Sequence, residues 1–172
     1  AFPALAGDGA WTHYGADPGG SRFVDARQIT ADNIARLKVA WTYRTGDLDR
    51  RPEAVGRSAF QATPILVDDA LVFCSPFNEV IALDPGTGAE RWRFDAAIVT
   101  DYRPANQFVC RGVASWQDPE RAPDILCATR LYMGTTDGRL LALDARRGVP
   151  CPDFGAAGTV RIDPGMELVY PG

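Results

Sequence analysis

The feature that most constrains the fold of this chain is a strand–turn–strand pattern that occurs twice. In the first copy, the apolar run 80–83 leads into the turn Asp-Pro-Gly-Thr-Gly at 84–88, and aromatic and charged residues then alternate over 91–94. The proline presets φ in the turn, and the two glycines allow positive φ. The second copy comes 60 residues later, where the apolar run 140–143 is followed by a turn that ends on Gly148. Such β-strand repeats are typical of the blades of a propeller.

The composition indicates a globular protein of moderate negative charge. The chain has 172 residues, of which 46% are hydrophobic and 23% charged, and its formal net charge is −4. It is long enough to bury a sizeable core, and the lack of any basic run argues against nucleic acid or an anionic membrane as a partner. No apolar run reaches the roughly 20 residues that span a bilayer, and no signal peptide is recognisable. The start resembles the interior of a longer chain, so we expect any targeting segment to lie outside this sequence.

Four cysteines and a single histidine bound the metal and redox chemistry of the chain. No two cysteines have the spacing of a zinc-binding pair, so a zinc site is not expected. Cys74 lies in the apolar run 71–74 and is expected to be a small core residue outside any disulfide. One disulfide among Cys110, Cys127 and Cys151 is expected in an oxidising compartment, and its connectivity stays open.

Short strand-like runs group into two sets, each the size of one propeller blade. We assign residues 58–98 to a first blade and 99–156 to a second, and we expect 157–172 to begin the connection to the next blade. The expected strands of the first blade are 61–67, 71–75, 79–83 and 90–94. Those of the second are 109–116, 126–134, 139–143 and a weaker fourth strand before residue 151, and one more short strand is expected at 159–162.

Residues 1–57 are predicted to form an extended segment, a short helix and an outer strand. Thr30 is a suitable N-cap for a helix over 31–37, whose apolar residues are spaced to face the core. The run 38–46 alternates as a strand does. This region is therefore expected to lie over the first blade.

Several residues that attract attention have a structural explanation. Trp41 and Trp92 are expected to be docking aromatics of the core rather than substrate contacts. Asp84, Asp137 and Asp144 lie at turns, where carboxylates bond to the nearby backbone. None of them is predicted to be a catalytic base.

Two blades do not make a complete propeller. Each blade buries its faces against its neighbours, so repeat folds need about three or more units or a closed ring. Two blades alone expose apolar faces and strand edges, which favours self-association. We therefore expect the chain to belong to a longer polypeptide, or to pair with another copy or with the rest of the propeller.

Several further runs, in order along the chain, resemble the N-terminal part of the pyrroloquinoline quinone (PQQ)-dependent dehydrogenases, or quinoproteins. The resemblance extends from Trp11 to about Gly165, and the closest likeness is to the membrane-bound branch that oxidises glucose, quinate and related polyols. The runs that carry it are 29–47, 61–65, the turn at 84–88, Cys110-Arg111-Gly112-Val113 and Asp137-Gly138-Arg139-Leu140.

The resemblance implies an all-β fold, a partial β-propeller of about two four-stranded blades from an eight-bladed ring, with a short N-terminal helix. It implies a periplasmic enzyme of a type that can be anchored in the inner membrane. In this family PQQ binds near the ring axis together with a divalent cation, usually Ca²⁺. A sugar, polyol or cyclic alcohol gives hydride to PQQ with an Asp as general base, and the electrons pass to a respiratory quinone.

The resemblance assigns three residues of this chain to the PQQ pocket, Gln61, Gln107 and Arg111. Arg111 follows a cysteine as the family's PQQ-contacting arginine does, and a guanidinium suits carboxylate or quinone oxygens. A salt bridge at a strand edge is the alternative role for Arg111. Gln61 stands where relatives have Glu or Gln beside the cofactor, although its amide can equally bond a neighbouring strand. Gln107 stands where membrane-bound relatives often have a histidine, which leaves Phe108 as the alternative stacking surface.

The family's general base and metal ligands come from later blades. No catalytic or metal-binding residue is therefore expected in this chain, and the chain alone is expected to be inactive. The alternative function is a non-catalytic β-propeller scaffold that binds partner proteins at the outer membrane. The runs 29–47 and 110–113 argue against a scaffold, because a scaffold needs only the docking turn.

Overall fold

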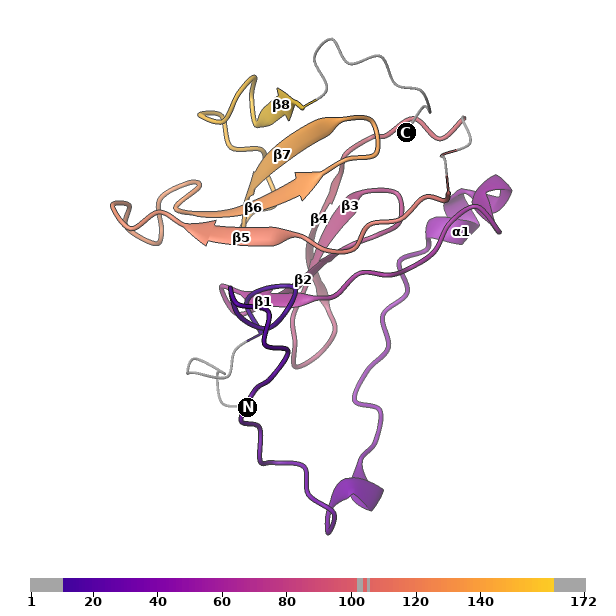
Figure 1. The fold of residues 1–172 in the computed structure, drawn as a ribbon, viewed down its shortest axis with the longest axis vertical. Coiled ribbons are helices and arrows are strands. Elements are labelled where there is room, and N and C mark those ends of the chain that lie inside the picture. The colour runs from indigo at the N-terminus through magenta and orange to yellow at the C-terminus, as the bar shows by residue number, and fades with distance from the viewer. Residues whose placement is uncertain (1–10, 102–103, 105, 163–172) are drawn as a thin grey trace.

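Two antiparallel sheets of four strands each form the body of the molecule (Figure 1). The computed structural model describes residues 11–101, 104 and 106–162. In each sheet the strands are hydrogen-bonded in the order in which they follow along the chain. This confirms the expected all-β fold of consecutive four-stranded blades. The strands of sheet 1 are β1 (Ile65–Val67), β2 (Ala70–Cys74), β3 (Glu79–Leu83) and β4 (Glu90–Asp95), and those of sheet 2 are β5 (Ala114–Gln117), β6 (Thr129–Gly134), β7 (Arg139–Asp144) and β8 (Thr159–Arg161).

The fourth strand of sheet 2 lies further along the chain than predicted. β8 pairs with β7 through Leu140 and Val160, so this sheet extends past the boundary placed at residue 156. The weaker strand expected before residue 151 is reduced to a single bridge between Leu143 and Pro150. The run 159–162, expected as a separate short strand, is the one that completes the sheet.

The first strand of each sheet is shorter than predicted. The strands expected to start at 61 and 109 begin only at Ile65 and Ala114. One backbone group of each stretch is used between them instead, because Thr63 N donates to the carbonyl of Arg111 at 2.9 Å. These two groups are therefore not available for the ladder of either sheet.

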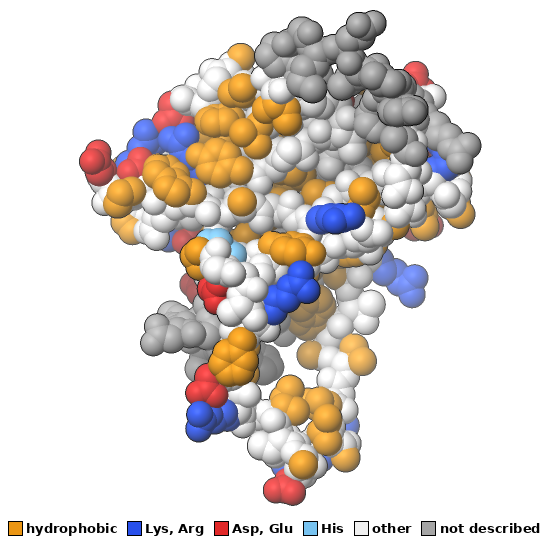
Figure 2. All heavy atoms as spheres, in the orientation of Figure 1, with side chains coloured by type: hydrophobic (Ala, Val, Ile, Leu, Met, Phe, Trp, Pro, Cys, Tyr) orange, Lys and Arg blue, Asp and Glu red, His pale blue; other side chains and the backbone are white. Residues whose placement is uncertain are grey.

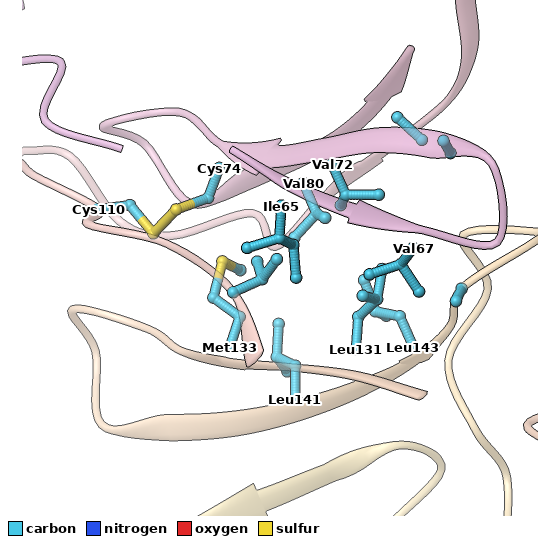
Figure 3. Close-up of a cluster of buried hydrophobic side chains, with 14 of the residues drawn as sticks. Ile65, Val67, Val72, Cys74, Val80, Cys110, Leu131, Met133, Leu141 and Leu143 are labelled. Carbon is cyan, nitrogen blue, oxygen red and sulfur yellow. A yellow bond between two sulfur atoms is a disulfide. The ribbon is translucent and has the colours of Figure 1, made fainter. Parts of the chain in front are cut away.

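The main core lies between the facing sides of the two sheets (Figure 3). Ile65, Val72 and Val80 point from sheet 1 toward Leu131 and Leu141 of sheet 2. Neighbouring residues in a strand point to opposite faces, so the alternate residues of β2 and β3 build a second cluster on the other side of sheet 1. That cluster consists of Phe73, Ile81 and Leu83, with Trp41, Tyr43, Ala62 and Leu71 packed against it.

Two tryptophans dock onto glycines of the repeated turn. The indole N–H of Trp41 donates to the carbonyl of Pro85 at 3.1 Å, and that of Trp92 donates to Ala145 at 3.2 Å. A Cβ added to Gly88 would lie 2.5 Å from the ring of Trp41, and one added to Gly148 would lie 2.4 Å from the ring of Trp92. The docking role expected for both tryptophans is confirmed, and Trp92 ties sheet 1 to sheet 2.

The segment before sheet 1 differs from the prediction. Between residues 11 and 64 it holds only short helical turns, which are η1 (Ile34–Arg36), α1 (Asp47–Arg50) and η2 (Pro52–Ala54). Thr30 does not cap a helix with its side chain; instead its backbone N–H donates to the side chain of Asn33 at 2.8 Å. Ile34 and Leu37, expected to face the core, are 58% and 59% exposed on an arm that extends away from the sheets (Figures 1 and 2).

The run 38–46 is extended but forms no strand. A strand needs a neighbour to accept and donate its backbone hydrogen bonds, and no described residue pairs with this run in a ladder. Val39 is 83% exposed, whereas Trp41 and Tyr43 are held by packing on sheet 1. The alternation of the sequence is thus present without the strand that it predicts.

A buried carboxylate joins the α1 region to sheet 1. Glu79, at the start of β3, is 2% exposed and accepts from Arg50 at 2.7 Å, from Arg51 at 3.0 Å and from Arg93. Burial on its own raises the pKa of Glu79, but the hydrogen bonds from the three guanidinium groups outweigh it and lower the pKa below its ordinary value. Glu79 is therefore ionised in the folded protein.

We predict that Gly148→Ala destabilises the folded protein by about 3 kcal/mol, because the methyl group displaces the indole of Trp92 from a site without free space. Gly56→Ala is the matched control, since Gly56 also has positive φ (+81°) but has no atom within 4 Å of the added Cβ. The control isolates the backbone cost of about 1 kcal/mol. Chemical denaturation of both variants in the full-length protein measures the difference, and equal losses would contradict the docking role.

We predict that Glu79→Gln lowers the free energy of unfolding by about 3 kcal/mol at pH 7, because three arginines lose the charge of the buried carboxylate that they share. The folded-state pKa of Glu79 lies below the ordinary 4.5. The stabilisation by its charge is therefore complete above pH 4.5 and is lost as the pH falls through the lowered pKa. The difference between wild type and variant must shrink in that acidic range.

Asp25→Asn is the control for this variant, because Asp25 forms an ion pair with Arg27 and its side chain is 64% exposed. Exposed pairs contribute about 0.5 kcal/mol or less. Urea titrations at a series of pH values measure both variants. A gap between wild type and Glu79→Gln that does not change with pH would contradict the assigned charge state.

Candidate functional site

Two of the residues assigned to the cofactor pocket, Gln61 and Arg111, lie on stretches that run side by side, and Gln107 directly precedes the second stretch. Phe108 N donates to the carbonyl of Arg57 at 2.7 Å, and Ala59 N donates back to the carbonyl of Phe108 at 3.0 Å. Further along, Thr63 N donates to the carbonyl of Arg111 at 2.9 Å. Gln61 lies between these two contacts. The structure therefore brings its stretch, 57–63, next to the stretch 108–111, although 47 residues separate Phe108 from Gln61 in the sequence.

The side chains assigned to the pocket are accessible and have no partner within the described part of the chain. Arg111 and Gln61 are exposed, and Gln107 is half-buried. Among residues 11–101, 104 and 106–162, no side-chain hydrogen bond or ion pair involves any of the three. The strand-edge salt bridge considered for Arg111 and the bond to a neighbouring strand considered for Gln61 are not seen in this part of the structure. Within these described ranges, the three groups have no partner that a ligand would have to displace.

The backbone beneath these side chains is firmly held. Cys110 forms a disulfide with Cys74, the last residue of β2 (Figure 3). Phe108 is fully buried, with its ring centroid 5.5 Å from that of Phe77. Phe108 is therefore not free to stack on a cofactor, contrary to the role considered for it. Its side chain anchors the stretch from the inside.

The cysteines pair differently from the prediction. Cys74 is not a free core residue, and the structure has two disulfides, Cys74–Cys110 and Cys127–Cys151, in place of the single one expected. The apolar run around Cys74 indicates burial, and burial is what the structure shows. Only the fold reveals that a second cysteine lies opposite it, because 36 residues separate the pair along the chain.

Sequence reasoning missed a polar link between the two sheets near these stretches. Asn78 is 1% exposed in the β2–β3 turn, and its side-chain oxygen accepts from the backbone N–H of Thr136 at 3.0 Å, in the β6–β7 turn. Asn78 has φ of +57°, a left-handed conformation that asparagine adopts more readily than most residues. This property is the one signal in the sequence that singles out Asn78. The link holds the turns at this end of the two sheets together.

The nearest acid in these turns is engaged in structure. Burial on its own raises the pKa of Asp137, but hydrogen bonds from Arg139 and Thr135 outweigh it and lower the pKa. A carboxylate held in its charged form by a guanidinium is a poor proton acceptor at neutral pH. This agrees with the structural role expected for Asp137.

The donor set suits an anionic planar ligand and not a metal ion. A guanidinium and two amides offer several N–H donors to carboxylate or carbonyl oxygens. Within the described ranges there is no group of three or more His, Cys, Asp or Glu side chains able to hold a metal ion. The site residues thus fit PQQ, whose carboxylates and quinone oxygens are acceptors.

No helix in the described part of the chain has the length and apolar character needed to cross a membrane.

An apolar hollow of about 470 Å³ lies on the face of sheet 1 that points away from sheet 2. Its lining includes Trp41, Phe60, Phe73 and Leu83, and Phe60 is 55% exposed. Aromatic and aliphatic walls without charged groups suit contact with another protein surface rather than polar chemistry.

Comparison with known proteins places the chain in a family. The family model described as "PQQ: Glucose/ethanol/alcohol dehydrogenase, beta-propeller domain" matches residues 11–172. Quinoprotein glucose dehydrogenase A of Acinetobacter calcoaceticus is 35% identical over all of this chain, and the glycerol dehydrogenase large subunit of Gluconobacter thailandicus is 39% identical over 95% of it. Each match covers 22% of the relative, so the chain spans about a fifth of the length of these proteins.

A solved structure has the same fold. The crystal structure of quinohemoprotein alcohol dehydrogenase from Comamonas testosteroni superposes with a TM-score of 0.70 and 27% sequence identity, over 96% of this chain and 21% of that one. The two sheets, the repeated docking turns and the family match along the described chain all lead to one conclusion. The chain belongs to the PQQ-dependent glucose, ethanol and alcohol dehydrogenase family, to its β-propeller domain.

Proposed function

We propose that this chain forms two neighbouring blades of a PQQ-dependent dehydrogenase that oxidises a sugar, a polyol or a cyclic alcohol. The match of the family model to residues 11–172 carries the proposal. The relatives include enzymes named for glucose, glycerol and quinate or shikimate. The same match favours an enzyme over the non-catalytic scaffold that the repeat alone would allow. The chain contributes one part of the wall of the PQQ pocket.

Within that pocket Arg111 binds and orients PQQ. Its guanidinium is exposed, and its backbone is fixed by the contact with Thr63. A planar fork of N–H donors recognises a carboxylate or a quinone oxygen in a defined orientation. Gln61, on the adjacent stretch, and Gln107 add amide donors and acceptors at the rim. PQQ supplies the acceptor for the hydride of the alcohol, and the electrons go on to a respiratory quinone.

The general base and the ligands of a divalent cation, Ca²⁺ in this proposal, belong to residues outside this chain. The described carboxylates near the stretches 57–63 and 108–111 support this division. Glu79 is bonded to three arginines, and Asp137 is bonded to Arg139. Neither is free to take a proton from an alcohol. The chain alone is therefore proposed to be inactive.

We propose that the protein is located in the periplasm. In this proposal the full-length form is of a type that can be anchored in the inner membrane. Two disulfides support the compartment, because disulfides persist in oxidising surroundings such as the periplasm and are rare in the cytosol.

The two sheets are proposed to be neighbours in a ring of eight blades. The apolar hollow beside Trp41 and Phe73 supports a further sheet packed on the outer face of sheet 1. Trp92 already shows how one blade docks on the turn of the next, and Trp41 repeats that contact from the chain segment before sheet 1.

We predict that Arg111→Ala in the full-length protein weakens PQQ binding by about 100-fold, because charge-assisted hydrogen bonds to an ionised group contribute about 1.5–3 kcal/mol. Titration of the apo-protein with PQQ, followed by quenching of tryptophan fluorescence, measures the affinity. Arg146→Ala is the control, since Arg146 is a half-exposed arginine in the turn after β7, paired with Asp68 in the β1–β2 turn. An unchanged affinity in Arg111→Ala would rule out the assigned role.

We predict that residues 1–172 produced alone associate or fold poorly, because the face around Phe60 and the arm with Ile34 and Val39 expose apolar side chains. Sedimentation velocity over a range of concentrations measures the association. A stable monomer at every concentration would contradict the need for further blades.

A further inference from the structure

We propose that the Cys74–Cys110 disulfide positions Arg111 for PQQ, and that it does so beyond its contribution to the stability of the fold. The inference rests on the proposed role of Arg111 in binding PQQ. Cys74 and Cys110 do not touch the cofactor in this proposal. They act through the backbone of the residue that follows Cys110.

The disulfide holds the backbone on the N-terminal side of Arg111. Cys110 immediately precedes Arg111, and its partner Cys74 is the last residue of β2, a strand in the middle of sheet 1. Cys74 is fully buried and Cys110 is 7% exposed. The crosslink thus ties an irregular stretch to the hydrogen-bonded frame of a sheet, and it lies at the edge of the main core (Figure 3).

A hydrogen bond holds the backbone of Arg111 itself. Its carbonyl accepts from Thr63 N at 2.9 Å. Arg111 is therefore fixed by a covalent link on one side and by the stretch of Gln61 on the other, while its side chain stays exposed without a partner among the described residues. A guanidinium on a fixed backbone loses less conformational freedom on binding than one on a mobile loop, which raises affinity.

The second disulfide provides a matched comparison. Cys127–Cys151 closes a segment with a sequence separation of 24, against 36 for Cys74–Cys110, so the two crosslinks restrict the unfolded chain to a similar extent. Cys127 precedes β6 and Cys151 follows β7. Cys74 lies at the other end of its sheet, where β2 passes into β3. The two disulfides thus differ in whether they lie next to Arg111.

The first measurement establishes the crosslink in the full-length protein. Alkylation of the native and of the denatured, unreduced protein, followed by peptide mass spectrometry, is expected to show Cys74 and Cys110 joined in one peptide pair. Alkylated Cys74 or Cys110 without reduction would overturn the proposal.

The second measurement is a double-mutant cycle on PQQ affinity. We expect Cys74→Ala/Cys110→Ala to weaken PQQ binding by about tenfold, and Cys127→Ala/Cys151→Ala to change it by less than about twofold, with a similar fall in thermal stability for both pairs. In the Arg111→Ala background, removal of the Cys74–Cys110 disulfide is expected to have no further effect on affinity, because the residue that it positions is absent.

The outcomes separate this inference from the proposed function. Equal losses of affinity in both cysteine variants would mean that only stability matters, and equal losses with and without Arg111 would mean that another group is positioned; either result overturns the inference. If Arg111→Ala alone leaves PQQ affinity unchanged, the assignment of Arg111 fails first. Should the Cys74→Ala/Cys110→Ala variant be partly unfolded, titration in sucrose, which strengthens folding without restoring the crosslink, decides between the same outcomes.

Discussion

The arrangement of the two sheets depends on an indole ring that packs against the glycine of a turn in the neighbouring sheet. Trp92 of β4 occupies the space beside Gly148, where a Cβ would lie 2.4 Å from the ring, and Trp41 does the same at Gly88. The turns are preformed for this contact. Asp84 accepts from the backbone N–H groups of residues 86 and 87, and Asp144 accepts from those of 146 and 147. Hydrogen bonds from Arg91 and then Thr87 lower the pKa of Asp84 to about 2, so its turn stays bonded throughout the physiological range.

This docking decides what the remaining residues can do. Once sheet 1 is held against sheet 2, the apolar side chains between them form one core, and the turns that contain Asn78 and Thr136 meet. The stretches 57–63 and 108–111 then run side by side at the edge of that core. A rigid backbone with an accessible guanidinium is the product of these constraints. Binding sites in propellers and other repeat folds are generally made in this way, by irregular segments placed by a regular frame.

Much of the fold was predictable because its signals are local. The sequence predicts β3 at its observed bounds. Its five residues are mostly apolar, and the proline and glycines of the turn that follows do not allow the strand to continue. Arg111, Gln107 and Gln61 were singled out only by resemblance to a family, and their role in binding PQQ stays a prediction. The failures share one cause. The alternation of 38–46 predicts a strand, and the cap at Thr30 predicts a helix, but a strand or a short helix persists only where other structure packs or pairs with it.

By itself, the sequence determined the repeated strand–turn–strand unit and the family, because both rest on short local runs of residue types. It also indicated Trp41 and Trp92 as docking aromatics, although the carbonyls that they reach, on Pro85 and Ala145, lie far away in the chain. Only the tertiary structure decided that β8 completes the second sheet, that Cys74 pairs with Cys110, and that Gln61 lies beside the stretch of Arg111. Each of these depends on contacts between residues far apart in sequence. No local pattern of residue types specifies which of the possible partners will meet.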